Sequence, residues 1–378
     1  MTIINKVELE NFKSYKKEYF ELNKLTVFCG NNSVGKSTAI QSLGILLQSQ
    51  FSKFVDLNGE LVHLGNVDDI HNYFNREEDS LSISVTGQDG NKYVWGYENG
   101  AERDSARISN KLSMSGEYSN YYFLQSELKN SRFQFIEAER YGPRDNLDLA
   151  DSKPHPYWLG TKGEYTVEVL NNLIDKQPKQ LSGLDTDPRK NKSVSRNDVF
   201  KHIEAWMGEI SPGYTLEPSK IEQANVTYNS ITPKYGQATK PINIGFGYSY
   251  ALSIVSALLI ADPNDIIIIE NPEAHLHPRG QSFIGRLIAL TAKAGVQVIV
   301  ETHSDHLLNG IRVTAKMDDG FDPSIFNLYY ISQGDEQSAV DRIKLTSDGK
   351  LSSWPEGFFD QQARDMFTIM TGKSEMPS

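Results

Sequence analysis

The chain has 378 residues and a formal net charge of −11, enough length for a sizeable core and too acidic for a surface that binds nucleic acid all over. Its apolar runs fall short of the eighteen or so residues that a membrane span requires, and its N-terminus lacks a charged-then-apolar leader, so we expect a cytoplasmic protein with no membrane partner. The single cysteine excludes an internal disulfide and a Cys-based metal cluster.

The first 28 residues alternate like the strands of an antiparallel layer, with a polar turn at residues 14–17. Lys13 lies at the start of this turn. Two interpretations of Lys13 fit the pattern equally well: a solvated charge at a strand end, or a cation that leans over a ligand bound just downstream.

An apolar run at residues 25–29 then breaks into a glycine-flanked loop, Gly30-Asn31-Asn32-Ser33-Val34-Gly35-Lys36-Ser37-Thr38, and helical spacing continues to about residue 50. A strand, such a loop and a helix N-terminus predict a phosphate-binding loop, because the glycines allow turns that aim successive N–H groups at one phosphate chain. We expect Lys36 to reach the outer phosphates and Ser37 to bind Mg2+. A glycine-rich surface turn is the simpler alternative, but the strand and helix on either side disfavour it. Cys29 is expected to be a small buried hydrophobe.

Residues 51–135 predict short strands and turns, and the polar stretch 105–119 is expected to be a loop. A buried strand at 133–136 delivers Arg140 and Arg144 at its carboxyl end, where either phosphate or partner contacts or structural ion pairs would suit them. Helices at 163–173 and 197–210 and two short strands within 216–231 follow.

A second glycine-rich turn, containing Gly245, Gly247 and Ser249, opens the apolar helix 251–260. Free N–H groups and a partial positive charge at a helix N-terminus suit an anion. Alone, this motif would be a weak signal.

An isoleucine strand at residues 266–269 follows and ends in Glu270, with Glu273 three residues further. One carboxylate in this position can hold Mg2+ through water, and a second can activate an attacking water.

A further apolar strand, 296–300, leads into Glu301-Thr302-His303, and His303 is expected to hydrogen-bond a terminal phosphate. Together with His275, His277 and His306 it would suggest a metal site, but no cysteine supports one, so we favour the phosphate contact. Two strands within 326–345 and a final helix from about residue 361 to 370 complete the chain.

In this order the motifs resemble an ABC-type ATPase head of the SMC/RecF/OLD-like branch of AAA-family ATPases. Residues 270–278, 301–305 and 354–360 resemble the subgroup with a DUF3696-type C-terminal segment, which occurs in bacterial anti-phage systems. The resemblance implies an α/β P-loop NTPase fold of the ABC-ATPase type, with a mixed central sheet flanked by helices, an antiparallel β layer and a helical insertion lobe. The ATPase core with its C-terminal segment would take residues 1–50 and 240–378, and the inserted lobe 51–239.

The resemblance also implies ATP and Mg2+ as cofactors and assigns roles by position. By this resemblance, Gly30 to Thr38 matches Walker A, and Ser37 and Glu270 match the metal-binding positions. Gly245, Gly247 and Ser249 match the signature that completes the site of a partner subunit. His303 matches the switch histidine, and Lys13 matches the N-terminal Phe-Lys/Arg-Ser motif. Asn271 stands where a catalytic glutamate is usual, so either Glu273 replaces it or hydrolysis is slow.

Such heads bind ATP between two subunits, which implies a head-to-tail dimer or a higher oligomer. We expect a dimeric ATPase switch that controls a partner effector, such as a nuclease or toxin, in anti-phage defence; nucleic acid as a further partner stays open. The alternatives are a slow- or non-hydrolysing nucleotide-dependent scaffold that holds an effector, and an ATPase of DNA repair or maintenance. A transporter subunit is disfavoured because the signature is not Leu-Ser-Gly-Gly-Gln, and a nuclease because no Toprim-type carboxylate set follows His303.

Overall fold

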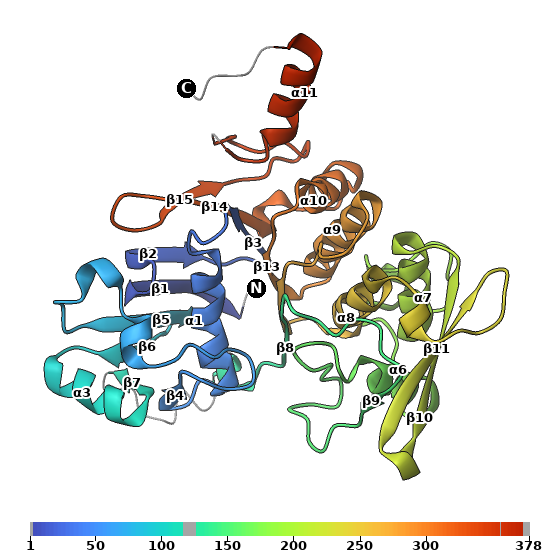
Figure 1. Cartoon of the computed structure of the whole chain (residues 1–378), viewed down its shortest axis with the longest axis horizontal. Coiled ribbons are helices and arrows are strands. Elements are labelled where there is room, and N and C mark those ends of the chain that lie inside the picture. The colour runs from blue at the N-terminus through green and yellow to red at the C-terminus, as the bar shows by residue number, and fades with distance from the viewer. Residues whose placement is uncertain (1–2, 116–125, 356, 373–378) are drawn as a thin grey trace.

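The computed structural model describes residues 3–115, 126–355 and 357–372, and its centre is a mixed six-stranded sheet (Figure 1). All neighbouring pairs in this sheet are parallel except β14 with β15. The strand order is β15-β14-β3-β13-β12-β8, with β3 (Leu25–Gly30), β8 (Phe133–Ile136), β12 (Ile266–Glu270), β13 (Gln297–Glu301), β14 (Phe326–Ser332) and β15 (Ala339–Ile343). The central strands are buried on both faces, as continuous apolar sequences predict.

A second, antiparallel sheet faces one side of this core and holds α1 (Lys36–Gln48) between the two sheets (Figure 1). Its order is β2-β1-β5-β6-β7-β4, with β1 (Ile4–Phe12), β2 (Tyr15–Glu21), β4 (Phe54–Asp56), β5 (Leu81–Gly87), β6 (Lys92–Tyr97) and β7 (Lys111–Ser115). The short helices α2 (Val67–Ile70), α3 (Gly100–Ser109) and α5 (Glu127–Asn130) accompany it. Because α1 contacts apolar side chains of both sheets, it is buried on most of its surface.

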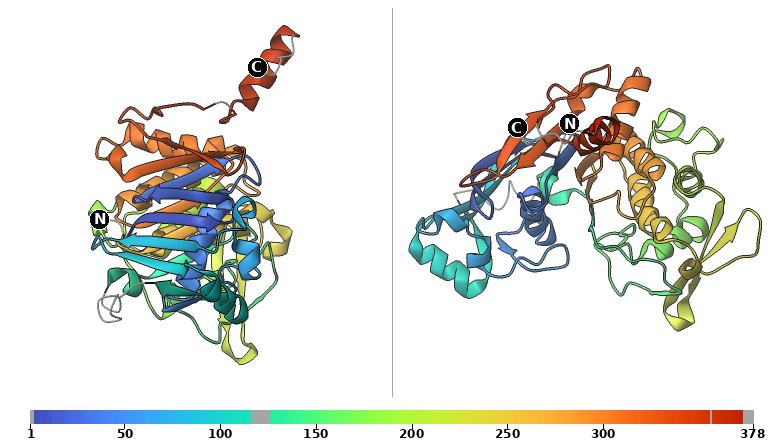
Figure 2. Two further views of the ribbon diagram at one scale, coloured as in Figure 1. Left: turned by 90° about the vertical axis from the view of Figure 1, so that its left-hand side faces the viewer. Right: turned by 45° about the horizontal axis from the view of Figure 1, so that its top comes forward.

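Helices cover the other face of the central sheet. Helices α8 (Phe246–Ile260) and α9 (Pro278–Lys293) contact its strands, and α6 (Thr166–Asp175), α7 (Val199–Ile210) and α10 (Asp305–Met317) pack against these two helices. Beside α6 and α7 lies a three-stranded sheet in the order β10-β11-β9, with β9 (Leu147–Asp148), β10 (Tyr214–Ile221) and β11 (Val226–Pro233). The last helix, α11 (Gln361–Thr371), projects from the body of the molecule (Figure 2).

These layers confirm the predicted fold class: a mixed central sheet flanked by helices, with an antiparallel layer and a helical lobe. The range 51–239, grouped by sequence as one inserted lobe, contributes strands to three different sheets. In particular β8 joins the central sheet beside β12, because its buried residues continue the apolar layers on both sides.

The loop predicted at residues 105–119 was wrong where the structure describes it, since α3 ends at Ser109 and β7 spans Lys111–Ser115. Residues 116–119 lie outside the described ranges. The polar helix α3 is anchored by Arg103, whose buried guanidinium pairs with Asp68 and Asp79. Such an anchor depends on residues distant in sequence and leaves no apolar periodicity to detect.

Candidate functional site

The glycine-flanked loop joins the carboxyl end of β3 to α1, and two glycines fix its path. Gly30 has φ +142°, and a Cβ atom there would lie 1.9 Å from the carbonyl oxygen of Ile331 on β14. Gly35 has φ +100°, and a Cβ atom there would lie 2.3 Å from the Ser14 hydroxyl. Both positions therefore require glycine for conformation and for space. Between them, residues 31–33 are exposed, as an N–H cradle for a ligand requires.

Lys36 folds back into its own loop. Its ammonium group donates a hydrogen bond to the carbonyl oxygen of Asn31, and the residue is only 3% exposed. Burial lowers the pKa of Lys36, and nearby carboxylates, Glu301 first, partly oppose this. The ammonium thus lies against the main chain of its own loop.

The turn between β1 and β2 packs against the loop and the first turns of α1. Tyr15 donates a hydrogen bond to the carbonyl oxygen of Gly35 at 3.0 Å, and Ser14 donates to the Thr38 hydroxyl at 3.2 Å. The ammonium of Lys13 donates to the Gln41 side chain at 2.6 Å, and burial lowers the pKa of Lys13. Lys13 is therefore held beside α1, about one helical turn beyond the loop.

Two buried carboxylates stand side by side where β12 and β13 end. Glu270 and Glu301 are partners in the parallel register, and alternation along each strand places them on the face of Ile268 and Ile299, toward α1. Ser37 donates a hydrogen bond from its hydroxyl to Oε1 of Glu301 at 3.0 Å.

Both carboxyl groups have raised pKa values. Burial, and next the charge of Glu301, raises the pKa of Glu270 to about 7. Burial also raises the pKa of Glu301, which Ser37 and Lys36 oppose. Glu301 had no role predicted from the sequence, although its position as the last residue of a buried strand, in phase with Ile299, was a signal.

The segment after β12 connects to the histidine after β13 through Glu273. Its carboxylate accepts hydrogen bonds from the Thr302 hydroxyl and the His303 backbone N–H, both at 2.7 Å. Burial, and next the charge of Lys36, lowers the pKa of His303. Asn271 has φ +43° and donates its backbone N–H to the carbonyl oxygen of Glu301 at 2.9 Å.

A cavity of about 280 Å³ opens beside the loop and the histidine. Asn31, Asn32 and His303 line one side, and Tyr330 with residues 357–361 of the C-terminal segment line the other. The C-terminal segment therefore borders the same cavity as the glycine-flanked loop.

Of the residues predicted to form a turn ahead of the helix, Gly245 is the N-cap of α8, whereas Gly247 and Ser249 lie in its first turn. Among the described residues no hydrogen bond or ion pair joins Gly245, Gly247 or Ser249 to residues 30–38. Gly247 packs tightly, since a Cβ atom there would lie 2.6 Å from the carbonyl oxygen of His275. Gly245 is the N-cap of α8 without a side-chain cap, and Tyr248 donates its N–H to the Gly245 carbonyl oxygen at 3.1 Å, which leaves the N–H groups of Phe246 and Gly247 to a ligand.

The two arginines that follow β8 have different surroundings. Arg140 is 3% exposed and donates to the carbonyl oxygens of Glu137, Glu270 and Asn271 at 2.7–2.8 Å, with its guanidinium over the ring of Tyr250. It therefore connects the carboxyl end of β12 to helix α8, which is the structural role rather than the phosphate contact among the alternatives predicted for this residue.

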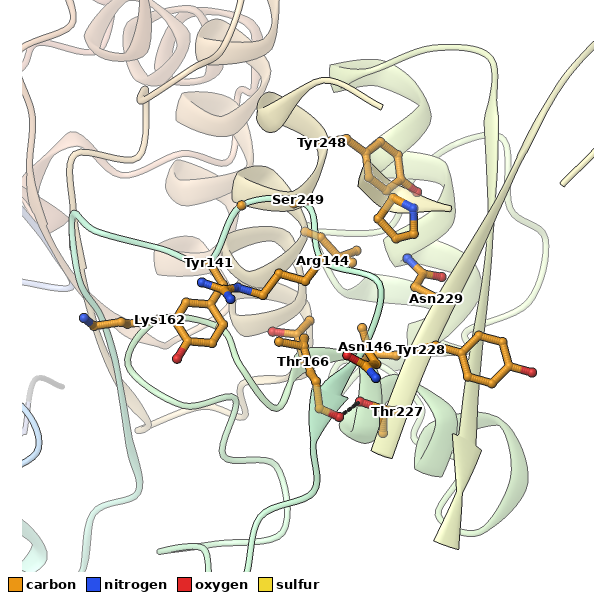
Figure 3. A pocket seen from close by; sticks show the side chains of 16 residues that line it. Tyr141, Arg144, Asn146, Lys162, Thr166, Thr227, Tyr228, Asn229, Tyr248 and Ser249 are labelled. Carbon is orange, nitrogen blue, oxygen red and sulfur yellow. Dashed lines mark hydrogen bonds between the residues drawn. The ribbon is translucent and has the colours of Figure 1, made fainter. Parts of the chain in front are cut away.

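Arg144 lies 4.2 Å over the ring of Tyr141 and forms no ion pair within the described residues. It lines a cavity between the start of α8, the segment after β8 and strand β11, together with Ser249 (Figure 3). A cation and a helix N-terminus without a side-chain cap thus lie close together at the start of α8.

Hydrogen bonds and strand register thus bring the loop residues 30–38, Glu270, Glu273 and His303 together at one edge of the central sheet, while Lys13 lies beside α1. No group of three or more His, Cys, Asp or Glu side chains in the described ranges is arranged to hold a metal ion by itself. Within those same ranges, no helix has the length and apolar character to cross a membrane.

Comparison with protein families matches residues 25–309 to the family described as "AAA domain, putative AbiEii toxin, Type IV TA system". The match spans the glycine-flanked loop, both carboxylate-bearing strand ends and His303. The chain belongs to this AAA-domain family. Residues 322–369 match a second family, described as a protein of unknown function (DUF3696), which includes the segment that borders the cavity.

Among curated proteins, the AAA-domain chain is similar to the Retron Vc95 probable ATPase of Vibrio cholerae serotype O1 biovar El Tor, with 20% identity over 82% of this chain and 71% of that protein. Among solved structures it is similar to the SMC head domain from Thermotoga maritima, with a TM-score of 0.45, 12% identity and coverage of 91% of this chain and 100% of that one. A Pyrococcus furiosus Smc head domain bound to the C-terminal domain of ScpA aligns with a TM-score of 0.44 and 13% identity, over 98% of this chain and 100% of that one. The chain is therefore an ATPase of the AAA type, similar to a retron protein described as a probable ATPase.

Proposed function

We propose that the chain binds and hydrolyses ATP with Mg2+ at the edge where β3, β12 and β13 end. The observation that carries this is the convergence of Lys36 and Ser37 with Glu270, Glu273 and His303, which come from three separate parts of the sequence. A hydroxyl and carboxylates are the hard oxygen ligands that Mg2+ prefers, and a glycine-flanked helix N-terminus suits a triphosphate.

The residues divide the work by position. Lys36 exchanges the Asn31 carbonyl for outer phosphate oxygens, while Ser37 and Glu270 supply oxygen atoms to the metal ion. Bound Mg2+ neutralises charge on the phosphates. Glu273 orients the attacking water, and His303, which its carboxylate positions through the backbone N–H, donates a hydrogen bond toward the terminal phosphate.

We propose further that two copies act head to tail, with the signature turn of one copy on the nucleotide of the other. Support comes from the separation of Gly245, Gly247 and Ser249 from their own loop, together with their free helix N-terminus. In the closed dimer, ATP controls a partner effector, such as a nuclease or toxin, in anti-phage defence. The similarity to a retron ATPase supports the setting.

ATP turnover by single variants tests the first part. Lys36→Ala should abolish phosphate release and Glu273→Gln should reduce it strongly, while Lys92→Ala, an exposed cation of the antiparallel sheet, should match wild type. A wild-type protein that neither binds nor cleaves ATP would refute the proposal.

Mixing two inactive variants tests the dimer. In a head-to-tail dimer of Lys36→Ala with Ser249→Arg, one composite site keeps both Lys36 and Ser249, so turnover should reappear on mixing. If each copy instead uses its own signature turn, the mixture stays as inactive as its components.

Asn271 supports a second candidate, a nucleotide-dependent scaffold with little hydrolysis. Its backbone is fixed by Glu301 and Arg140, and it brings no carboxylate to the usual catalytic position. This candidate requires ATP-dependent dimerisation or effector retention with turnover near background, which light scattering and phosphate release measure together.

A further inference from the structure

Glu301 stands closer to the phosphate-binding loop than the carboxylate at the Walker B position. Strand β13, which ends in Glu301, is the direct neighbour of β3, whereas β12, which ends in Glu270, is one strand further away. Neighbouring strands are about 4.8 Å apart, so Glu270 begins about 10 Å from the strand that leads into the loop.

Hydrogen bonds reinforce this difference. The Glu301 carboxylate already receives the Ser37 hydroxyl at 3.0 Å, whereas the Glu270 carboxylate accepts the backbone N–H of Ala138 at 3.2 Å. Ala138 follows β8, on the side of β12 away from the loop. Glu301 is therefore drawn toward the loop and Glu270 away from it.

The negative charges of the site favour binding of a cation when a nucleotide is present. Glu270 and Glu301 are adjacent and mostly buried, and the ammonium of Lys36 is close enough to interact with Glu301. When Lys36 contacts the phosphates, its positive charge offsets the triphosphate as well as Glu301. The two adjacent carboxylates then need another positive charge nearby. The described side chains provide no preformed metal cage, so such an ion must complete its coordination with phosphate oxygens and water.

We propose that Glu301, with Ser37, is the direct protein ligand of the divalent cation and that Glu270 contacts the ion through water. This inference rests on the nucleotide site proposed above and changes its ligand set. It predicts that the protein binds the ion tightly only together with a nucleotide.

Electron paramagnetic resonance of Mn2+, titrated into protein with ADP, tests the inference without turnover. Glu301→Gln, which keeps the side-chain size and an acceptor for Ser37, should weaken Mn2+ binding at least about tenfold. Glu270→Gln should weaken it less. Binding of a fluorescent ADP analogue in EDTA should stay within about threefold of wild type for both variants, because neither carboxylate contacts the nucleotide directly.

The results separate this inference from the proposed function. Nucleotide binding by wild type, with Mn2+ affinity unchanged in Glu301→Gln or reduced more in Glu270→Gln, overturns the ligand assignment alone. A wild type that binds no nucleotide in either condition overturns both. If Glu301→Gln does not fold, the pair Glu301→Asp and Glu270→Asp replaces it, and the shorter side chain at 301 should cost the larger share of Mn2+ affinity.

Discussion

Replacing Arg140 by methionine tests whether this arginine holds the site together or contacts phosphate. Three hydrogen bonds from a charged donor to carbonyl oxygens are worth roughly 5–9 kcal/mol together. Burial lowers the pKa of Arg140 to about 10, which corresponds to a cost of about 3 kcal/mol. We therefore expect Arg140→Met to lower the free energy of unfolding by about 4 kcal/mol.

The matched control is Arg144→Met, because Arg144 also lies over a tyrosine ring but donates no such bonds within the described residues. An exposed cation–π contact is worth about 0.5–1 kcal/mol, so this variant should unfold almost like wild type. Chemical denaturation followed by tryptophan fluorescence measures both variants. If Arg140→Met keeps wild-type stability and loses only nucleotide affinity, Arg140 is a phosphate ligand and the structural role is refuted.

Three further predictions concern buried or paired groups. Asp187→Asn should cost about 3–5 kcal/mol in a denaturation series, since it leaves the fully buried Arg189 without its counterion, whereas Asp185→Asn, at an exposed ion pair, should cost less than about 1 kcal/mol. Partial burial raises the pKa of Asp262, but a hydrogen bond from Lys179 and further partners lower that pKa to about 2. The contribution of Asp262 to the free energy of unfolding should therefore be lost as the pH falls from about 4 to about 2. Asp262→Asn should make the free energy of unfolding depend less on pH in this range. Cys29 is buried, which raises its pKa, so Ellman's reagent should label one thiol only after unfolding; fast labelling of the native protein would contradict this burial.

The sequence by itself determined the parts whose signal is local. The glycines at 30 and 35, the isoleucine run of β12 and the apolar strand before His303 each specify their own backbone, because positive φ and burial on both faces restrict the residue types. Strands of a parallel sheet end at a common edge, so their terminal side chains were expected to meet there.

Only the tertiary structure decided which of these side chains face one another. The Ser37 hydroxyl meets Glu301 across 264 residues, and Arg140 reaches the carbonyl of Glu270 across 130. Such pairings depend on strand order and on alternation between the faces of the sheet, which no local pattern encodes. For the same reason the sequence did not predict α3. This polar helix is held in place by the ion pairs of the buried Arg103 rather than by an apolar face.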